Sequence, residues 1–214
     1  RPFEYLDVQG KLTEAGKAAR TIAYRNVAGQ TTNYATNSAL LHIQHNVAFI
    51  NPMFDTYVID EGAFADFHYC LIANNEANLN NGTNNSGGFS VWRGSYGNFY
   101  HCTFVGNSSQ YGTALTVGGG SYASLDASIV WNNPGDNALA SVQWDENGSQ
   151  LDVFHSVVQG GENGMYADDL SNIYQDGVID IDPLFCDPEN GDFSIDMNSG
   201  AITPWGDPID RKSV

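Results

Sequence analysis

A short apolar block recurs along the chain, opened in most copies by a small residue and closed five positions later by Asn or Gly. The copies are NVAGQT (26–31), which is degenerate, NVAFIN (46–51), CLIANN (70–75), CTFVGN (102–107), SIVWNN (128–133) and SVVQGG (156–161). Their openings follow one another at intervals of about 20 to 30 residues, which is the range of structural repeats that stack into solenoids. The pattern therefore predicts a solenoid rather than a layered globular domain.

Upstream of each block, apolar and polar positions alternate as in a strand with one buried face. The apolar row, three residues before the openings, is Ile43, Phe67, Phe99, Leu125 and Val153. The polar row, one residue earlier, is His42, Asp66, Asn98, Ser124 and Asp152. A further strand is expected around Tyr57/Ile59, Phe89/Val91 and Leu115/Val117. Three strands and three turns per repeat predict an all-β fold, a parallel β-helix of about six coils.

We expect a single structural domain with capped ends. The segment 12–22 begins with Thr13 as a helix N-cap and becomes basic later, which favours a short helix in an N-terminal cap over residues 1–25. The coils are expected over residues 26–161. The acidic segment 162–214, punctuated by Pro and Gly, is expected to form an irregular C-terminal cap.

Stacked coils place like residues on like. Asn51, Asn75, Asn107 and Asn133 are expected to bond one another while adopting the left-handed conformation. Cys70 and Cys102 occupy equivalent inward positions, either as small buried side chains or close enough for a disulfide bridge.

Composition narrows the range of partners. The chain has 8 Lys plus Arg against 25 Asp plus Glu, a formal net charge of −17. Such a chain repels nucleic acid and anionic membranes, and it has no apolar run long enough to cross a bilayer. The turn-rich composition favours a secreted or cell-surface protein. Because residue 1 is Arg, we also expect a longer precursor.

Several motifs resemble a known group of proteins. The runs FYHCTFVGN (99–107), SIVWNN (128–133), SVVQGG (156–161) and IDPLFCDPENGDF (181–193) occur in the order typical of secreted bacterial parallel β-helix proteins. These are the polymorphic-outer-membrane-protein-like and anchored surface-protein group, and the resemblance covers about residues 40–200. It implies right-handed coils and an extracellular location. The chain departs from the group in having His45, Tyr69, His101, Ala127 and His155 where Asn usually precedes the small opening residue.

Aromatic residues at one repeat position indicate a sugar-binding surface. Phe64, Tyr96 and Tyr122 share an offset and predict a ladder along the coils, and Trp92 adds a further aromatic side chain. Extended polysaccharides bind to such surfaces through ring stacking and hydrogen bonds to hydroxyl groups. The main hypothesis is therefore a non-catalytic module for glycan binding, adhesion or surface assembly. Aromatic ladders also stabilise β-helices, so a purely structural role is the alternative.

A polysaccharide-degrading enzyme is the second hypothesis. His42, Asp66, His68, Tyr100 and Asp126 are expected on one lateral face, where His, Tyr and carboxylates could serve a lyase or glycoside hydrolase as acid and base. Metal binding by His42, Asp66 and His68 is a further reading. Arg93 is the one basic residue between 26 and 210, so the lyase reading lacks a group that neutralises a uronic acid.

Two further sites follow from the pattern. Asp180, Asp182, Asp187 and Asp192, with Glu189 and Asn190, form a candidate calcium site in the C-terminal cap, the alternative being a solubilising acidic loop. The outward positions of the repeated blocks form an apolar strip that includes Leu71, Val105, Ile129 and Val157. We expect this strip to be covered by a terminus or to mediate self-association, which could also occur at the coil ends.

Overall fold

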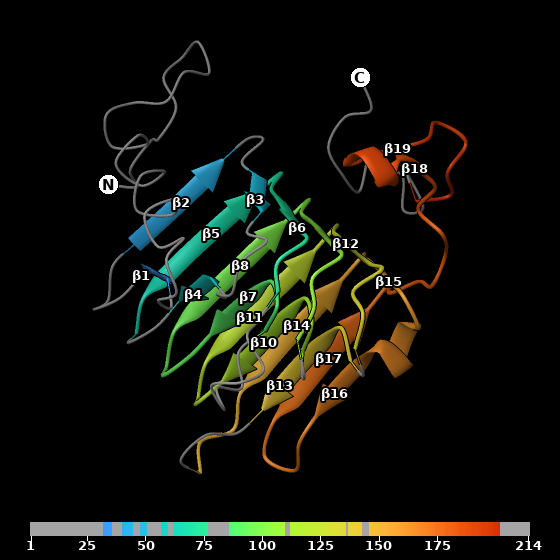
Figure 1. Cartoon of the computed structure of the whole chain (residues 1–214). Helices are drawn as coiled ribbons and strands as arrows, with labels where there is room; N and C mark the ends of the chain where they lie inside the picture. The colour runs from blue at the N-terminus through green and yellow to red at the C-terminus, as the bar shows by residue number, and fades with distance from the viewer. Residues whose placement is uncertain are drawn as a thin grey trace, which may run out of the picture.

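The chain is wound into a solenoid of parallel strands in a computed structural model that describes residues 32–35, 40–44, 48–50, 57–59, 62–76, 86–109, 112–135, 137–142 and 146–201 (Figure 1). The predicted all-β fold and parallel stacking are confirmed. The helix expected at residues 12–22 lies outside the described residues. Within them, the helices are two short 3₁₀ turns, η2 (Gly161–Gly164) and η3 (Pro188–Asn190), and no helix there is long and apolar enough to span a bilayer.

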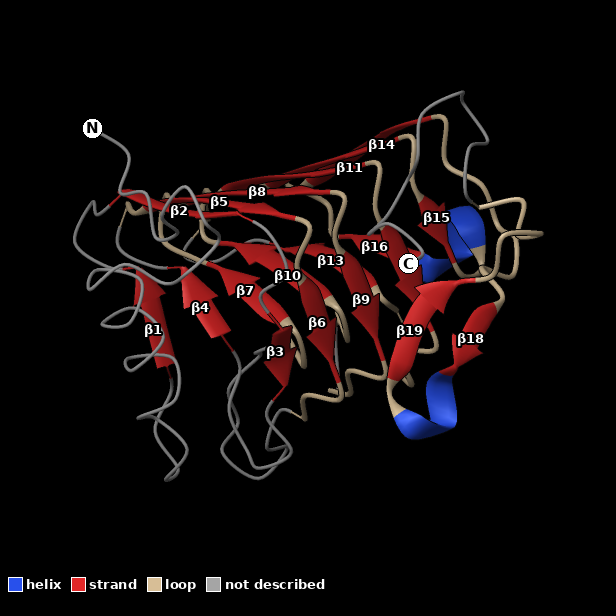
Figure 2. Cartoon of the chain, turned by 90° about the horizontal axis from the view of Figure 1, so that it is seen from above, coloured by secondary structure: helices blue, strands red, loops and turns tan. Residues whose placement is uncertain are grey.

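Three parallel sheets form the walls of the solenoid, and the chain passes through them in turn (Figure 2). Sheet 1 contains β1 (Thr32–Ala35), β4 (Tyr57–Ile59), β7 (Phe89–Val91), β10 (Leu115–Gly118), β13 (Leu139–Val142) and β16 (Met165–Ala167). Sheet 2 contains β2 (Leu40–Gln44), β5 (Phe64–His68), β8 (Tyr96–Tyr100), β11 (Tyr122–Asp126), β14 (Gln150–Phe154) and β17 (Asn172–Asp176). Sheet 3 contains β3 (Ala48–Ile50), β6 (Leu71–Ala73), β9 (Thr103–Val105), β12 (Ile129–Trp131) and β15 (Val157–Val158).

The predicted register holds along sheet 2. Phe67 pairs with Phe99, Phe99 with Leu125, and Leu125 with Val153, and all four side chains are fully buried. The rings of Phe67 and Phe99 stack with centroids 4.9 Å apart and planes 7° apart. Burying a Phe side chain stabilises a fold by about 2–3 kcal/mol, so this inward row makes a large contribution to the core.

The asparagine ladder is confirmed for three of its four members. Asn75 donates its side-chain amide to Asn107 at 2.8 Å, and Asn107 donates to Asn133 at 3.0 Å. The conformational part of the prediction was wrong, because the left-handed residues stand one position earlier, at Asn74 and Asn132, with φ of 55° and 51°. The Asn side chains of the ladder point inward, where Asn75 and Asn107 are fully buried. Asn51 lies outside the described residues.

Parallel pairing continues past residue 161, into the segment expected to form an irregular cap. Strand β16 pairs with β13, and β17 pairs with β14 over all five residues. The inward side chains Met165, Ile173 and Val178 pack partly buried against the core. The C-terminal segment therefore adds coil strands before it leaves the stack.

The end of the described chain folds back over sheet 3. Strands β18 (Phe185–Asp187) and β19 (Asp192–Ile195) form an antiparallel hairpin. Phe193 packs against Leu71, Ala73 and Val105, and Ile195 packs against Ile129 and Val157. From Leu71 to Val157, the apolar strip is thus covered by the chain itself, which is the first of the two expectations.

Candidate functional site: the outer face of sheet 2

The outer face of sheet 2 carries three columns of side chains along the solenoid. Strands β5, β8 and β14 alternate between buried and partly exposed positions, so their first, third and fifth residues face outward. No described helix or strand lies over this side in either view (Figures 1 and 2). In contrast to sheet 3, this face is thus not covered by any described helix or strand.

Two hydroxyl ladders fix the corners at either end of these strands. At the entry, the backbone amide of Ser95 donates to Ser121 Oγ at 3.2 Å, and that of Ser121 donates to Ser149 Oγ at 3.3 Å. At the exit, the amide of Cys102 donates to Ser128 Oγ at 2.9 Å, and that of Ser128 donates to Ser156 Oγ at 3.1 Å. Satisfied buried donors hold the turns in one conformation. The outer face is therefore presented on a rigid frame.

The first column is the predicted aromatic ladder. Phe64, Tyr96 and Tyr122 pair in register, with ring centroids 6.3 Å apart for Phe64 and Tyr96 and 6.2 Å for Tyr96 and Tyr122. The central ring, Tyr96, is 50% exposed. These rings lean on one another and still present surface to solvent, which a purely internal stack would not do.

Trp92 does not belong to this column. It follows β7 of sheet 1, and a Cβ at Gly118 would overlap its indole ring. The ring therefore fills the space left by that glycine beside β10, and it is partly buried there. Trp92 thus lies on another wall than Tyr96, as expected, and its role in ligand binding stays a prediction.

The middle column is a hydrogen-bonded polar row. Ser124 Oγ donates to Asn98 Oδ1 at 2.8 Å, and Asn98 Nδ2 donates to Asp66 Oδ1 at 2.8 Å. The row thus links three neighbouring strands and lies one pleat from the aromatic column. Carboxylate, amide and hydroxyl groups are the groups that bind sugar hydroxyls.

Asp152 continues the middle column and connects it to the aromatic one. Its Oδ2 accepts from the Tyr122 hydroxyl at 2.8 Å, and its Oδ1 accepts from Gln150 Nε2 at 2.8 Å. Burial, the hydrogen bond to Asp152 and the charge of that carboxylate together raise the pKa of Tyr122 to about 12. Because Tyr122 stays protonated, it remains a donor that orients the carboxylate.

The third column contains three of the predicted catalytic residues on consecutive strands, because His68 pairs with Tyr100 and Tyr100 pairs with Asp126. His68 and Tyr100 lie face to face, with ring centroids 4.8 Å apart and planes 21° apart. Asp66 is bonded to Asn98 in the middle column, and the side chain of His42 lies outside the described part, although its backbone pairs with Asp66.

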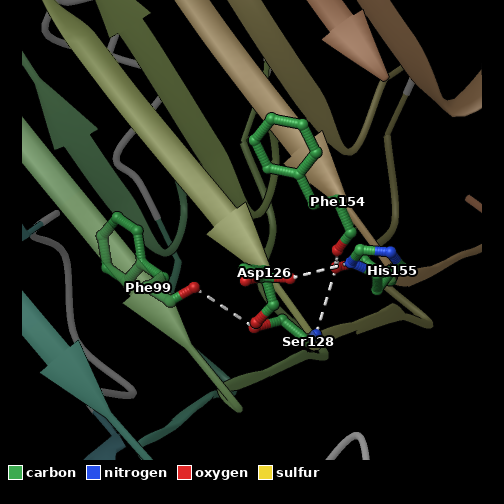
Figure 3. A network of polar contacts seen from close by, with 6 residues as sticks. Phe99, Asp126, Ser128, Phe154 and His155 are labelled. Carbon is green, nitrogen blue, oxygen red and sulfur yellow. Dashed lines mark hydrogen bonds and ion pairs between the residues drawn. The ribbon is translucent and has the colours of Figure 1, made fainter. Parts of the chain in front are cut away.

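Asp126 contacts a histidine outside the predicted catalytic set, His155. In the sequence, His155 stands out only as a departure from the family pattern. His155 Nδ1 lies 3.4 Å from Asp126 Oδ1, and the two side chains are 49% and 38% exposed (Figure 3). His155 occupies the left-handed corner position, with φ of 43°. A second stack follows the same corner, since Tyr69 and His101 have parallel rings 4.7 Å apart. Only knowledge of the corner geometry would have revealed this pair.

A two-carboxylate hydrolytic centre is also not favoured on this face. Asp126 and Asp152 lie on adjacent strands, but both oxygens of Asp152 accept hydrogen bonds from Tyr122 and Gln150 at the opposite end of the strand. Asp66 and Asp126 are two strands apart, which is about 10 Å by strand spacing alone and beyond the useful range for such a pair. Hydrolysis by either carboxylate pair stays a prediction from the sequence.

The predicted calcium site is not assembled in the C-terminal segment. Asp182, Asp187 and Asp192 each accept a hydrogen bond from a nearby residue, namely Leu184, Asn190 and Ser194. Among the residues that the structure describes, no three His, Cys, Asp or Glu side chains are grouped to hold a metal ion. The predicted set of His42, Asp66 and His68 is not tested by this, because the side chain of His42 lies outside the described part. These aspartates act as turn-forming residues.

Comparison with known proteins adds no relative. No protein-family profile, no curated protein and no solved structure matches the chain. The expected membership of the bacterial surface-protein group and the right-handed coiling stay predictions from the sequence, while the parallel β-solenoid rests on the strand pairing itself.

Proposed function

We propose that the outer face of sheet 2 binds glycan chains without turning them over, in a protein that works outside the cell or at its surface. The observation that carries this proposal is the register of two columns, the aromatic ladder of Phe64, Tyr96 and Tyr122 beside the polar row of Asp66, Asn98 and Ser124. A sugar ring offers an apolar face for stacking and equatorial hydroxyls for hydrogen bonds, so it needs both columns at once.

The repetition of the site along the coils suits an extended polymer. Equivalent strands lie about 4.8 Å apart, so consecutive rings and polar groups recur along the solenoid axis. A chain laid across the strands could contact several coils, and each weak contact would add to the others. The two hydroxyl ladders support this reading, because a preformed surface loses little entropy on binding.

The non-catalytic reading is favoured over the enzyme by how the candidate groups are used. His68 stacks on Tyr100, and Asp66 is bonded to Asn98. The Asp126–His155 contact is an arrangement among the described residues that favours chemistry, and both of its side chains are partly exposed. The enzyme therefore remains a second candidate, tied to that pair.

A retention screen with product analysis tests the proposal. Purified protein is run on affinity gels containing neutral, amino and uronic-acid polysaccharides, and the same polymers are assayed for released ends. We expect retention without release, and retention should be lost in Tyr96→Ala but kept in Tyr166→Ala. Tyr166 is a matched control, since it is 44% exposed on sheet 1. Equal retention of the two variants would contradict the proposal, and product release lost in His155→Ala would establish the enzyme.

A further inference from the structure

The charge of the same face determines which glycans it can accept. Its outward positions include the carboxylates of Asp66, Asp126, Asp152 and Asp176, on β5, β11, β14 and β17. Among the described residues the sole Lys or Arg is Arg93, which lies in the turn before β8 and not on the face. The whole chain carries a net charge of −17, so the protein as a whole repels anionic polymers.

We infer that the outer face of sheet 2 selects glycans that carry free amino groups, such as glucosamine polymers, over neutral and uronic-acid glycans. This inference rests on the proposed function and adds the class of ligand. An ammonium group donates three hydrogen bonds and has a positive charge, which matches carboxylates that stand among aromatic rings. Neutral sugars would use the rings and the hydrogen-bonding groups of the polar row, but they carry no charge to pair with the carboxylates.

The Tyr122–Asp152 pair combines an aromatic ring for sugar stacking with a carboxylate for an ammonium group. The Tyr122 hydroxyl donates to Asp152 Oδ2 at 2.8 Å, so the aromatic ring and the carboxylate are adjacent and fixed relative to each other. Each Asp152 oxygen accepts one protein hydrogen bond, and a carboxylate has about four lone-pair sites in all. A sugar stacked near Tyr122 would bring an amino substituent to acceptor sites that these two bonds leave open.

Aromatic faces add to this preference for positive charge. A cation placed over a Tyr or Phe ring is attracted by the electron density of the ring face. Tyr96, half exposed between Phe64 and Tyr122, offers such a ring on the strand next to that of Asp66. The rings therefore favour the same ligand class as the carboxylates, through cation–π attraction instead of charge pairing.

A bridging metal would be the rival route to a charged glycan. Calcium ions could link a uronic acid to the aspartates, but the described residues include no group of three potential metal ligands. The amino-glycan proposal needs no ion. The two routes are distinguished by adding calcium or a chelator.

Calorimetric titration with matched oligosaccharides tests the inference. The ligands are a glucosamine hexamer at a pH where its amines are protonated, the N-acetylated hexamer of equal length, and a galacturonic-acid oligomer with and without calcium. We expect the glucosamine hexamer to bind at least about tenfold more tightly than the N-acetylated one, an effect of the size of one charge-assisted hydrogen bond. The preference should shrink as salt is raised.

Two variants locate the preference on the face. Asp152→Asn keeps an acceptor for Tyr122. Gln150 can rotate its amide so that its oxygen accepts from the new NH₂ group, so the fold should persist. We expect its affinity for the glucosamine hexamer to fall about tenfold while its affinity for the N-acetylated hexamer is unchanged. Asp169→Asn, an exposed carboxylate between β16 and β17, is the matched control.

The outcomes separate the inference from the proposed function. Equal or tighter binding of the N-acetylated hexamer or the uronic-acid oligomer would overturn the inference and leave glycan binding in place. A preference that Asp169→Asn reduces as much as Asp152→Asn would assign it to the overall charge and also overturn the inference. Failure of every glycan to bind would overturn the proposed function itself.

Discussion

The hydroxyl group of Tyr122 donates a 2.8 Å hydrogen bond to the carboxylate of Asp152 on the next strand, across the outer face of sheet 2. The bond links the aromatic column to the polar one, and it is the point where the two parts of the candidate site meet. Burial and this carboxylate raise the pKa of the phenol to about 12. The pair can therefore be followed by titration.

We predict that one of the 11 tyrosines titrates near pH 12. A pKa raised from 10 to about 12 favours the protonated, folded form, so its contribution to stability is complete below pH 10 and is lost as pH rises to 12. Ultraviolet titration of phenolate formation measures this. The late step should vanish in Tyr122→Phe and move to lower pH in Asp152→Asn, and a late step that persists in Tyr122→Phe would refute the assignment.

The buried asparagine ladder gives a second prediction. Asn107 accepts from Asn75 at 2.8 Å and donates to Ile72 O at 2.9 Å, and it is fully buried. Replacing it with Ala leaves buried partners unsatisfied, which costs about 3 kcal/mol. Chemical denaturation measures the free energy of unfolding. Asn172→Ala, at an exposed site on β17, should cost less than about 0.5 kcal/mol, and equal losses in both variants would contradict the ladder's role.

Thiol reactivity tests the packing of the coils. Cys70 and Cys102 are free and buried, and Cys186 is free and exposed. Stacking thus does not join the two inward cysteines by a bridge. A thiol reagent should modify one cysteine quickly in the native protein and all three after unfolding. Two or more fast thiols, or a single titratable thiol in denaturant, would be incompatible with this arrangement.

The C-terminal hairpin should stabilise the protein by covering the apolar outer face of sheet 3. Phe193 is 9% exposed against Leu71, Ala73 and Val105, and its ring meets the edge of Phe185 at 5.5 Å. Truncating it to Ala should lower the free energy of unfolding by about 3 kcal/mol and uncover part of the apolar strip. Sedimentation should then detect concentration-dependent association. Met197→Ala, at a side chain that is 81% exposed, is the control and should do neither.

The periodicity of the sequence was sufficient to predict the stacked coils. It was insufficient to predict the contacts at their corners and the hairpin that covers sheet 3. Phe67, Phe99, Leu125 and Val153 could be placed in one buried row because stacking repeats a simple two-residue alternation. The aromatic column followed from the same register. What depends on the repeat alone was therefore predictable.

The remaining features depend on contacts that no repeat position encodes. The Asp126–His155 contact requires the left-handed corner at His155. The cover over sheet 3 requires a hairpin that folds back from outside the repeats. The serine ladder at Ser95, Ser121 and Ser149 had a signal, because each serine follows a glycine, but its meaning depends on the stacking of the coils.

The most direct test of the central claim is fluorine NMR of protein labelled with 3-fluorotyrosine, titrated with an oligosaccharide that the protein retains. Resonances are assigned with single Tyr→Phe variants. If glycans bind the outer face of sheet 2, the Tyr96 and Tyr122 resonances will shift with a common affinity while that of Tyr166, on sheet 1, stays in place. Shifts at Tyr166 without shifts at Tyr96 and Tyr122 would contradict the account and place the ligand on another wall of the solenoid.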